Sequence, residues 1–269
     1  MFDTPQPCFQ QGFGLGNIVI EQLLVTCVRL HRFIMKRLHS GNLREVTAND
    51  VNLTHAELNN ASLDRAWMWR SKLADSRLHN ASFVGARLKD TDLSRANLAH
   101  ASFEKADLHN CALEGASMIG TSFKEANLCD ASFSGADATN SNFESSKLHN
   151  ANFERATLNG ARFAKAQAPG ARFSHAELKG TCLRAAQLDG TDWTEASWQG
   201  CDATRAHLEG ASMQRSTMEG VIADSTEFVT ASKEKLPRAA DLWGHADREH
   251  HNLERPRQQH PRHTHPKAR

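Results

Sequence analysis

The sequence predicts an elongated repeat fold, a solenoid, rather than a conventional globular domain. The chain has 269 residues, and from Val51 to Thr230 it repeats every five residues for 36 uninterrupted periods. At the centre of each period, from Leu53 to Phe228, Leu occurs 17 times and Phe 9 times. The position two residues earlier is always small, and no charged residue enters either set. A short fixed period of this kind is typical of stacked repeats.

The five-residue spacing excludes an amphipathic helix over the repeat region. Two inward positions in every five match neither a period of about 3.6 residues nor a two-residue alternation. A third position of each period also supports the five-residue repeat, because all eleven Gly residues within 51–230 fall two positions after a centre, as at Gly85 and Gly160. Gly, Asn and Asp are frequent at that position, which favours a turn with positive or near-bridge φ at every fifth residue.

Three units carry a family resemblance: Ala-Asn-Leu-Ala-His (96–100), Ala-Asp-Leu-His-Asn (106–110) and Ala-Asn-Leu-Cys-Asp (126–130). They resemble the A(D/N)LXX unit of the pentapeptide-repeat family. This resemblance implies an all-β solenoid, a right-handed quadrilateral β-helix in which four pentapeptides make one square coil. The same face then recurs every 20 residues, and about nine coils spaced by about 4.8 Å make a rod about 43 Å long.

Stacked coils predict columns of like side chains along the rod. One column places a core ladder of five aromatic rings at Phe83, Phe103, Phe123, Phe143 and Phe163. In another column Leu gives way to Ala168, which Pro169 follows. Because Pro lacks a backbone N–H group, we expect a local kink or a thinner core there.

The chain divides into four expected segments. Residues 1–40 form an N-terminal segment whose residues 17–38 suit an amphipathic helix, interpreted as a cap on the first coil because exposed terminal repeats aggregate. A dimerisation helix and a membrane-surface anchor are the alternatives for it. Residues 41–230 form the β-helix, 231–244 a C-terminal cap, and 245–269 a His-rich basic tail that is expected to be disordered.

Targeting signals and charge restrict the function classes. Residues 17–38 carry too many charges for a membrane span, and the opening MFDTPQPCFQQ lacks the basic start of a signal peptide. The formal net charge is +1, with 24 acidic against 19 basic residues in 41–230, so direct nucleic-acid binding is not expected. Cys111 and Cys201 take the small inward position and predict buried free thiols in a reducing compartment. A bacterial cytoplasmic protein is therefore expected, with secretion as an effector left open.

No catalytic, cofactor or metal site is predicted. His109, Cys129 and His149 share one outward column, but the recurring sequence Leu-His-Asn explains this arrangement by repeat duplication. No Gly-rich phosphate loop, GxSxG, HExxH or CxxC pattern occurs, and the His spacing of the tail fits no metal site. The sequence therefore predicts a protein that is not an enzyme and needs no cofactor.

The one candidate interaction surface is the pair Trp67 and Trp69. Met68 is the centre of its period, so both Trp side chains must point away from the core. Exposed aromatic pairs are common interface anchors. Packing beneath the N-terminal segment is the competing interpretation.

Two function classes compete. The preferred one is a non-enzymatic scaffold or adaptor that binds a protein partner of unknown identity, with a homodimer also open. The family resemblance offers alternatives: a DNA-mimicking topoisomerase (gyrase) modulator that confers quinolone or toxin resistance, or a secretion-system-associated effector or accessory protein. The columns Glu104–Lys124–Glu144 and Lys72–Asp92 alternate in charge, which predicts ion pairing along the ladder rather than a phosphate-like acidic stripe.

Overall fold

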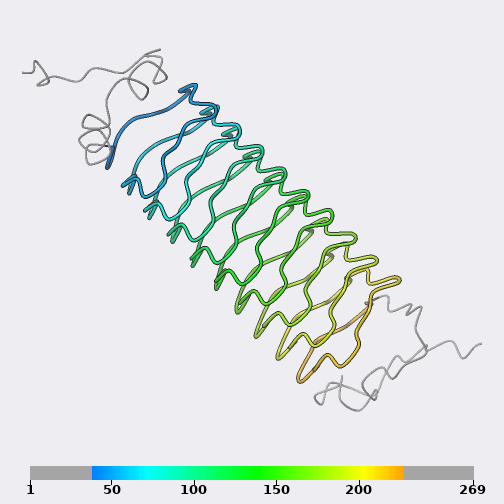
Figure 1. Ribbon diagram of the computed structural model, residues 1–269. Coiled ribbons are helices and arrows are strands. Elements are labelled where there is room, and N and C mark those ends of the chain that lie inside the picture. Colours follow the sequence, from blue (N-terminus) through cyan, green and yellow to red (C-terminus); the bar gives the residue numbers. More distant parts are fainter. Residues whose placement is uncertain (1–37, 227–269) are drawn as a thin grey trace, which may run out of the picture.

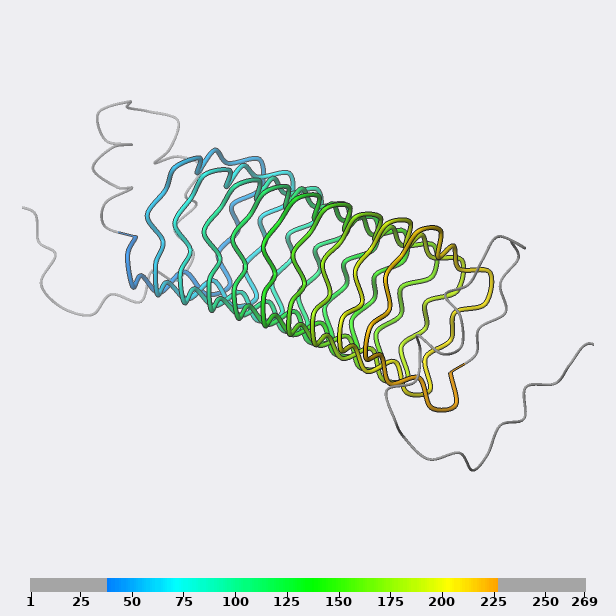
Figure 2. The same ribbon diagram turned by 90° about the horizontal axis from the view of Figure 1, so that it is seen from below.

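The computed structural model describes residues 38–226, which wind into one rod of stacked coils (Figure 1). Isolated parallel β-bridges join each bridge residue to the one 20 positions later, from Asn42–Ser62 to Asp202–Ile222. Four columns of bridges run along the rod and begin at Asn42, Thr47, Asn52 and Glu57, which gives it four faces. Within 38–226 the structure has no α-helix, and its bridges form no longer strand. Figure 2 shows the same stack from below.

Each five-residue unit makes a ladder contact and then a turn. The Leu43 N–H group donates to the Ser62 carbonyl at 2.7 Å, and the Ser62 N–H group donates to the Gly41 carbonyl at 2.9 Å. The turn closes where the Ala56 N–H group donates to the Leu53 carbonyl at 3.0 Å. Every fifth residue from Ser40 to Ser225 has a φ of 52–70°, which confirms the predicted positive-φ turn.

The Asn or Asp in the second position of many units closes this turn from the side. Its side-chain oxygen accepts a hydrogen bond from the N–H group two residues later, as from Thr54 to Asn52 at 3.1 Å and from Thr194 to Asp192 at 2.9 Å. This N–H group takes no part in the ladder, and short Asn and Asp side chains are well suited to such local bonds. The recurring Asn and Asp thus have a structural role.

The core is a single column of buried side chains along the rod axis. One ladder stacks its rings at centroid distances of 4.6–5.2 Å: Phe83, Phe103, Phe123, Phe143 and Phe163. The sequence analysis did not single out a second ladder, on the opposite face: Phe133, Phe153, Phe173 and Trp193. Rings of the two ladders contact each other edge to face at 5.6–6.0 Å, and these contacts stabilise the packing of neighbouring coils.

The kink expected at Pro169 does not occur. The ladder continues through this coil, with Leu148 N–H donating to Gln167 O at 2.6 Å and Ala168 N–H donating to Gln187 O at 2.8 Å. Pro169 occupies the first turn position, whose N–H group the ladder does not use, and its carbonyl still accepts from Asn150 at 3.1 Å. A fixed negative φ suits that position, so Pro is accommodated there without disruption.

The surface ion pairs also differ from those expected. Ion pairs do not form in two columns where they were predicted, Glu104–Lys124–Glu144 and Lys72–Asp92. The ion pairs found among residues 38–226 join other side chains. Asp50–Arg70 and Asp75–Arg95 pair along the corners with two hydrogen bonds each, and Glu144–Arg162 pairs diagonally. Most ion pairs in 38–226 use Arg, whose forked donors match a carboxylate better than the single Lys ammonium group does.

Several expectations concern parts of the chain outside the described residues. They are the helix proposed over 17–38, apart from its last residue, the C-terminal cap at 231–244 and the tail at 245–269. The count of nine coils runs to residue 230, past the last described residue, and stays a prediction. In 38–226 there is no helix with the length and apolar character to cross a membrane.

Candidate interaction surface

An aromatic and basic surface near the N-terminal end of the rod is the strongest candidate site. We call it the tryptophan patch and define it by Trp67, Trp69, Arg87, Arg65 and Glu45. Trp67 is 38% exposed and is one of three exposed large hydrophobic residues in 38–226, with Ile119 and Ile222. On a rod whose other faces are mostly polar, an exposed indole next to a second one marks a contact surface.

The indole rings and one guanidinium group are stacked together. The centroids of Trp67 and Trp69 are 5.5 Å apart with 29° between their planes, and Arg87 Cζ lies 4.0 Å from the Trp67 ring centroid. Trp67 and Arg87 are bridge partners 20 residues apart, so the ladder itself places one side chain next to the other. The arrangement is a cation–π contact at the surface.

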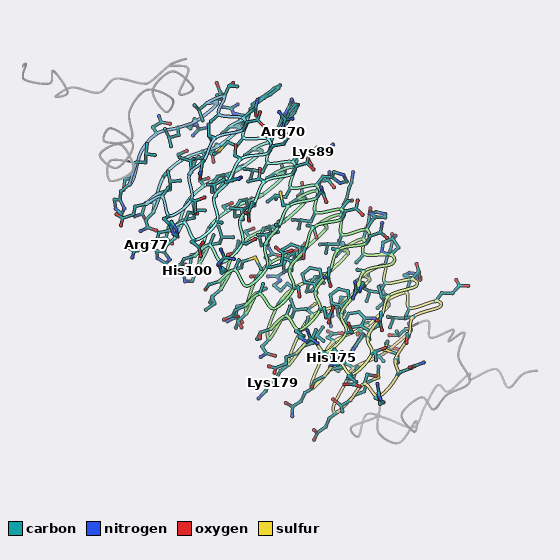
Figure 3. All side chains as sticks on the ribbon, in the orientation of Figure 1. Arg70, Arg77, Lys89, His100, His175 and Lys179 are labelled. Atoms are coloured by element: carbon teal, nitrogen blue, oxygen red, sulfur yellow. The ribbon has the colours of Figure 1, made fainter. Side chains whose placement is uncertain are left out.

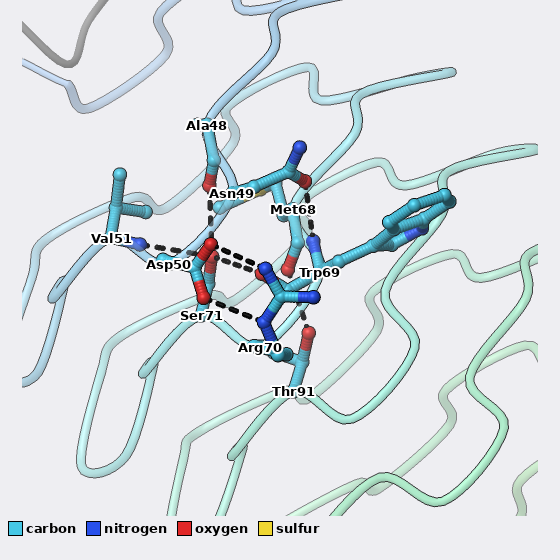
Figure 4. A network of polar contacts seen from close by, with 9 residues as sticks. All are labelled: Ala48, Asn49, Asp50, Val51, Met68, Trp69, Arg70, Ser71 and Thr91. Atoms are coloured by element: carbon cyan, nitrogen blue, oxygen red, sulfur yellow. Dashed lines mark hydrogen bonds and ion pairs between the residues drawn. The ribbon is translucent and has the colours of Figure 1, made fainter.

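The backbone beneath the patch is fixed by hydrogen bonds. The Trp67 N–H group donates to the Val46 carbonyl at 2.8 Å, and the Trp69 N–H group donates to Asn49 Oδ1 at 2.9 Å. Figure 4 shows this contact beside the Arg70–Asp50 pair, whose two hydrogen bonds are both 2.7 Å long. The patch therefore stands on a rigid scaffold, which lowers the entropy cost of binding.

A shallow depression of about 380 Å³ adjoins the Trp67 ring. Its lining residues are Glu45, Arg65, Trp67, Gly85 and Arg87, and Arg65 is paired with Glu45 at 2.7 Å. Gly85 has a φ of +66°, and a Cβ atom there would lie 3.6 Å from Arg65 Cγ. Gly85 therefore adds no side chain to the lining of the depression, and the Arg65 stem is the nearest neighbour of this position.

The two Trp residues of the patch were predicted from sequence, but Arg87, Arg65 and Glu45 were not. The signal was available, because a 20-residue offset places Arg87 on the rung after Trp67. Sequence alone did not single out Arg87, because it differs from the other arginines only in having no carboxylate partner, and partners are known only from the structure. Figure 3 shows Arg70 and Lys89 near this end of the rod and Lys179 toward the other end.

In the column of His109, Cys129 and His149, two of the side chains meet and the third faces a carboxylate group. Cys129 Sγ lies 3.6 Å from His149 Nδ1, while His109 Nδ1 lies 3.7 Å from an Asp130 carboxylate oxygen. Among the described residues no group of three or more His, Cys, Asp and Glu side chains is arranged to hold a metal ion.

Cys111 and Cys201 are buried free thiols, as the sequence predicted. Their Sγ atoms donate to the carbonyls of Leu88 at 2.9 Å and Leu178 at 2.7 Å. Burial raises the pKa of both thiols, that of Cys201 to about 12, because a thiolate is poorly solvated in the core. They fill the space that Ala fills in other coils and are protonated at neutral pH.

The geometry defines a four-sided solenoid with an aromatic surface patch, and the comparisons with known proteins identify its class. A model of the pentapeptide repeat region matches residues 106–188, and a model of pentapeptide repeats in eight copies matches 71–110 and 181–220. The chain belongs to the pentapeptide-repeat family, whose members are generally non-enzymatic structural or interaction proteins. No curated protein sequence matches it.

Solved structures of the family share the fold, a right-handed β-helix. The chain is similar to HetL, a pentapeptide repeat protein involved in heterocyst differentiation regulation from the cyanobacterium Nostoc sp., with 26% identity, a TM-score of 0.51, and coverage of 80% of this chain and 94% of HetL. A second similar structure is QnrB1, a plasmid-mediated fluoroquinolone resistance protein, with 18% identity, a TM-score of 0.49, and coverage of 70% and 91%.

Proposed function

We infer that this protein is a non-enzymatic interaction scaffold whose tryptophan patch binds a protein partner. The observation that supports this most directly is the exposed Trp67 ring, stacked on Trp69 and covered on part of its surface by Arg87. Trp and Arg are the residues most enriched among the anchors of protein interfaces. The rigid ladder below them holds the patch in one geometry before a partner arrives.

The comparison with HetL is consistent with this role. HetL has 26% identity to this chain and is described as involved in the regulation of a differentiation process. A regulatory protein of this fold without a catalytic constellation acts through what it binds. Fold alone does not identify the partner, so this support concerns the class of function and not the process.

The alternative of a DNA-mimicking topoisomerase modulator has less support from the surface. A phosphate mimic needs a continuous stripe of unneutralised carboxylates, whereas several carboxylates in 38–226 are neutralised by arginines and interrupt such a stripe, as in Asp50–Arg70, Asp75–Arg95 and Arg172–Glu154. The likeness to QnrB1 concerns the fold alone. A secretion-associated effector role is the remaining alternative, and no feature of residues 38–226 favours it.

Cellular context forms part of the same proposal. We assign the protein to the bacterial cytoplasm, because two core thiols, Cys111 and Cys201, are free and occupy positions that suit a reducing compartment. The partner is a protein; a homodimer is a second arrangement that the patch would serve. Membrane-surface contact through residues 17–38 and direct nucleic-acid binding are not part of the proposal.

Affinity capture with matched variants tests the scaffold function. The full chain is compared with Trp67→Ala/Trp69→Ala and with Ile119→Ala, which alters a side chain of the same 38% exposure elsewhere on the rod. We expect the double variant to lose specific partners that the wild type and Ile119→Ala retain, while circular dichroism shows that the β-helix is still folded. Retention of all partners together with a lowered melting temperature would instead assign the Trp pair to packing beneath the N-terminal segment.

A further inference from the structure

We propose that the tryptophan patch recognises a carboxylate on an acidic segment of the protein partner. In this arrangement Arg87 pairs with the carboxylate, and the exposed part of Trp67 packs against a neighbouring apolar side chain of the same segment. The inference rests on the proposed scaffold function and adds the chemistry of the partner.

Most arginines on the surface of this rod are already paired with carboxylates. Residues 38–226 contain twelve arginines, and ten of them lie within ion-pair distance of a carboxylate: Arg44, Arg65, Arg70, Arg77, Arg95, Arg155, Arg162, Arg172, Arg184 and Arg215. Arg87 and Arg205 are the two described arginines without such a partner. Of these, Arg87 alone lies on an exposed aromatic ring.

The Arg87 side chain is held in place against Trp67 and keeps donors that can bind a carboxylate. Its Cζ atom lies 4.0 Å from the Trp67 ring centroid, so one face of the guanidinium group is occupied by the indole. The N–H donors of a guanidinium group point outward in its own plane, and a stacked guanidinium group therefore keeps donors for a carboxylate. Its side-chain freedom is already reduced, which lowers the cost of ordering it on binding.

The carboxylates near Arg87 are engaged by other groups, and there is space for a ligand beside Trp67. Glu45 is paired with Arg65 at 2.7 Å. Asp107, the next residue in the ladder column of Arg87, accepts hydrogen bonds from the Asn127 amide at 2.8 Å and from the His109 N–H group at 3.3 Å. The depression beside Trp67 has a volume of about 380 Å³, which leaves room for a side chain.

Charge also favours an acidic segment of another protein over this chain's own N-terminal segment as the occupant of the tryptophan patch. Residues 1–37 contain four basic side chains, Arg29, Arg32, Lys36 and Arg37, and two acidic ones, Asp3 and Glu21. Their net charge is positive, so they do not complement the unpaired Arg87 guanidinium group of the patch. An acidic segment of another protein does.

A peptide array tests the proposal with the full-length chain. The array carries random-sequence peptides, matched versions with every Asp and Glu changed to Asn and Gln, and overlapping peptides of residues 1–37. Wild type is compared with Arg87→Gln and with Arg205→Gln, which removes the other unpaired arginine far from the patch. Circular dichroism checks that both variants keep the fold.

We expect the wild type to retain peptides that contain Asp or Glu beside an apolar residue, and Arg87→Gln to bind them roughly tenfold more weakly, as loss of a charged hydrogen bond would give. Arg205→Gln should match the wild type. Equal binding by Arg87→Gln, equal binding of the neutral peptides, or preferential binding of peptides from residues 1–37 would each overturn the carboxylate assignment.

The array also separates this inference from the scaffold function. If Trp67→Ala/Trp69→Ala loses peptides whose binding does not depend on Asp or Glu, the carboxylate inference fails while partner binding by the patch stands. If neither the Trp nor the Arg87 variants change peptide binding or partner capture, both proposals fail.

Discussion

Removing one ring from the middle of the Phe ladder should destabilise the protein strongly. The side chain of Phe123 is fully buried. It stacks on Phe103 at 5.2 Å and on Phe143 at 5.1 Å, and it meets Phe133 edge to face at 6.0 Å. Truncation of a buried Phe to Ala costs about 3–5 kcal/mol. Since each coil touches only its neighbours, the lost layer has no distant contacts to compensate for it.

We therefore expect Phe123→Ala to lower the free energy of unfolding by about 4 kcal/mol. Phe123→Leu is the matched control, because Leu63 and Leu183 already occupy the same column, and it should cost about 1–2 kcal/mol. Urea unfolding followed by far-UV circular dichroism measures both values. A loss below about 1 kcal/mol for Phe123→Ala, or an equal loss for the two variants, would refute the conclusion that stacked rings carry the stability of the central coils.

Three further predictions concern the turns, the corner ion pairs and the thiols. A Cβ atom at Gly160 would lie 2.3 Å from a neighbouring amide oxygen, whereas at Gly135 it would meet nothing within 4 Å, so Gly160→Ala should lower the melting temperature more than Gly135→Ala does. Hydrogen bonding to its Arg partner lowers the pKa of Asp75 from 3.8, so the stabilisation that it gives is present above that pH and is lost as pH falls through the folded-state pKa. Melting temperatures of wild type and Asp75→Asn should therefore differ at pH 7 and converge at low pH, and a constant difference would contradict the assignment. Because burial raises the pKa of Cys201 to about 12, iodoacetamide at pH 8 should modify the half-buried Cys129 and leave Cys201 unmodified until the protein unfolds, as peptide mass spectrometry would show.

The repeat made the backbone of this protein predictable. A small residue and a large one at fixed positions, with Gly confined to a third, correctly placed the positive-φ turns at every fifth residue. Such a pattern is robust because 36 copies impose the same local geometry, and one unfavourable unit is held in place by its neighbours. Pro169 is an example. The general rule that Pro disrupts strands predicted a kink, but Pro169 lies at a position of the five-residue unit whose N–H group the ladder does not use, so no kink forms.

Side-chain partners on the surface were much less predictable. Residues 20 apart share a column, but a pairing also depends on side-chain length and on the corner geometry, so Arg162 pairs with Glu144 across the diagonal. The stacking of Arg87 on Trp67 has the same origin: sequence placed both in one column, and only the structure showed that Arg87 has no carboxylate partner. The Trp pair was visible in sequence because two large apolar residues violate the polar pattern of outward positions.

Site-specific photo-crosslinking tests the central claim most directly. A photoreactive side chain replaces Lys89, on the rung after Trp69, or Lys179, toward the other end of the rod (Figure 3), in the full-length chain. The account predicts that the captured partner is crosslinked from position 89 and not from position 179, and that Arg87→Gln weakens the crosslink. A partner crosslinked from position 179 and not from position 89 would contradict the assignment of binding to the tryptophan patch.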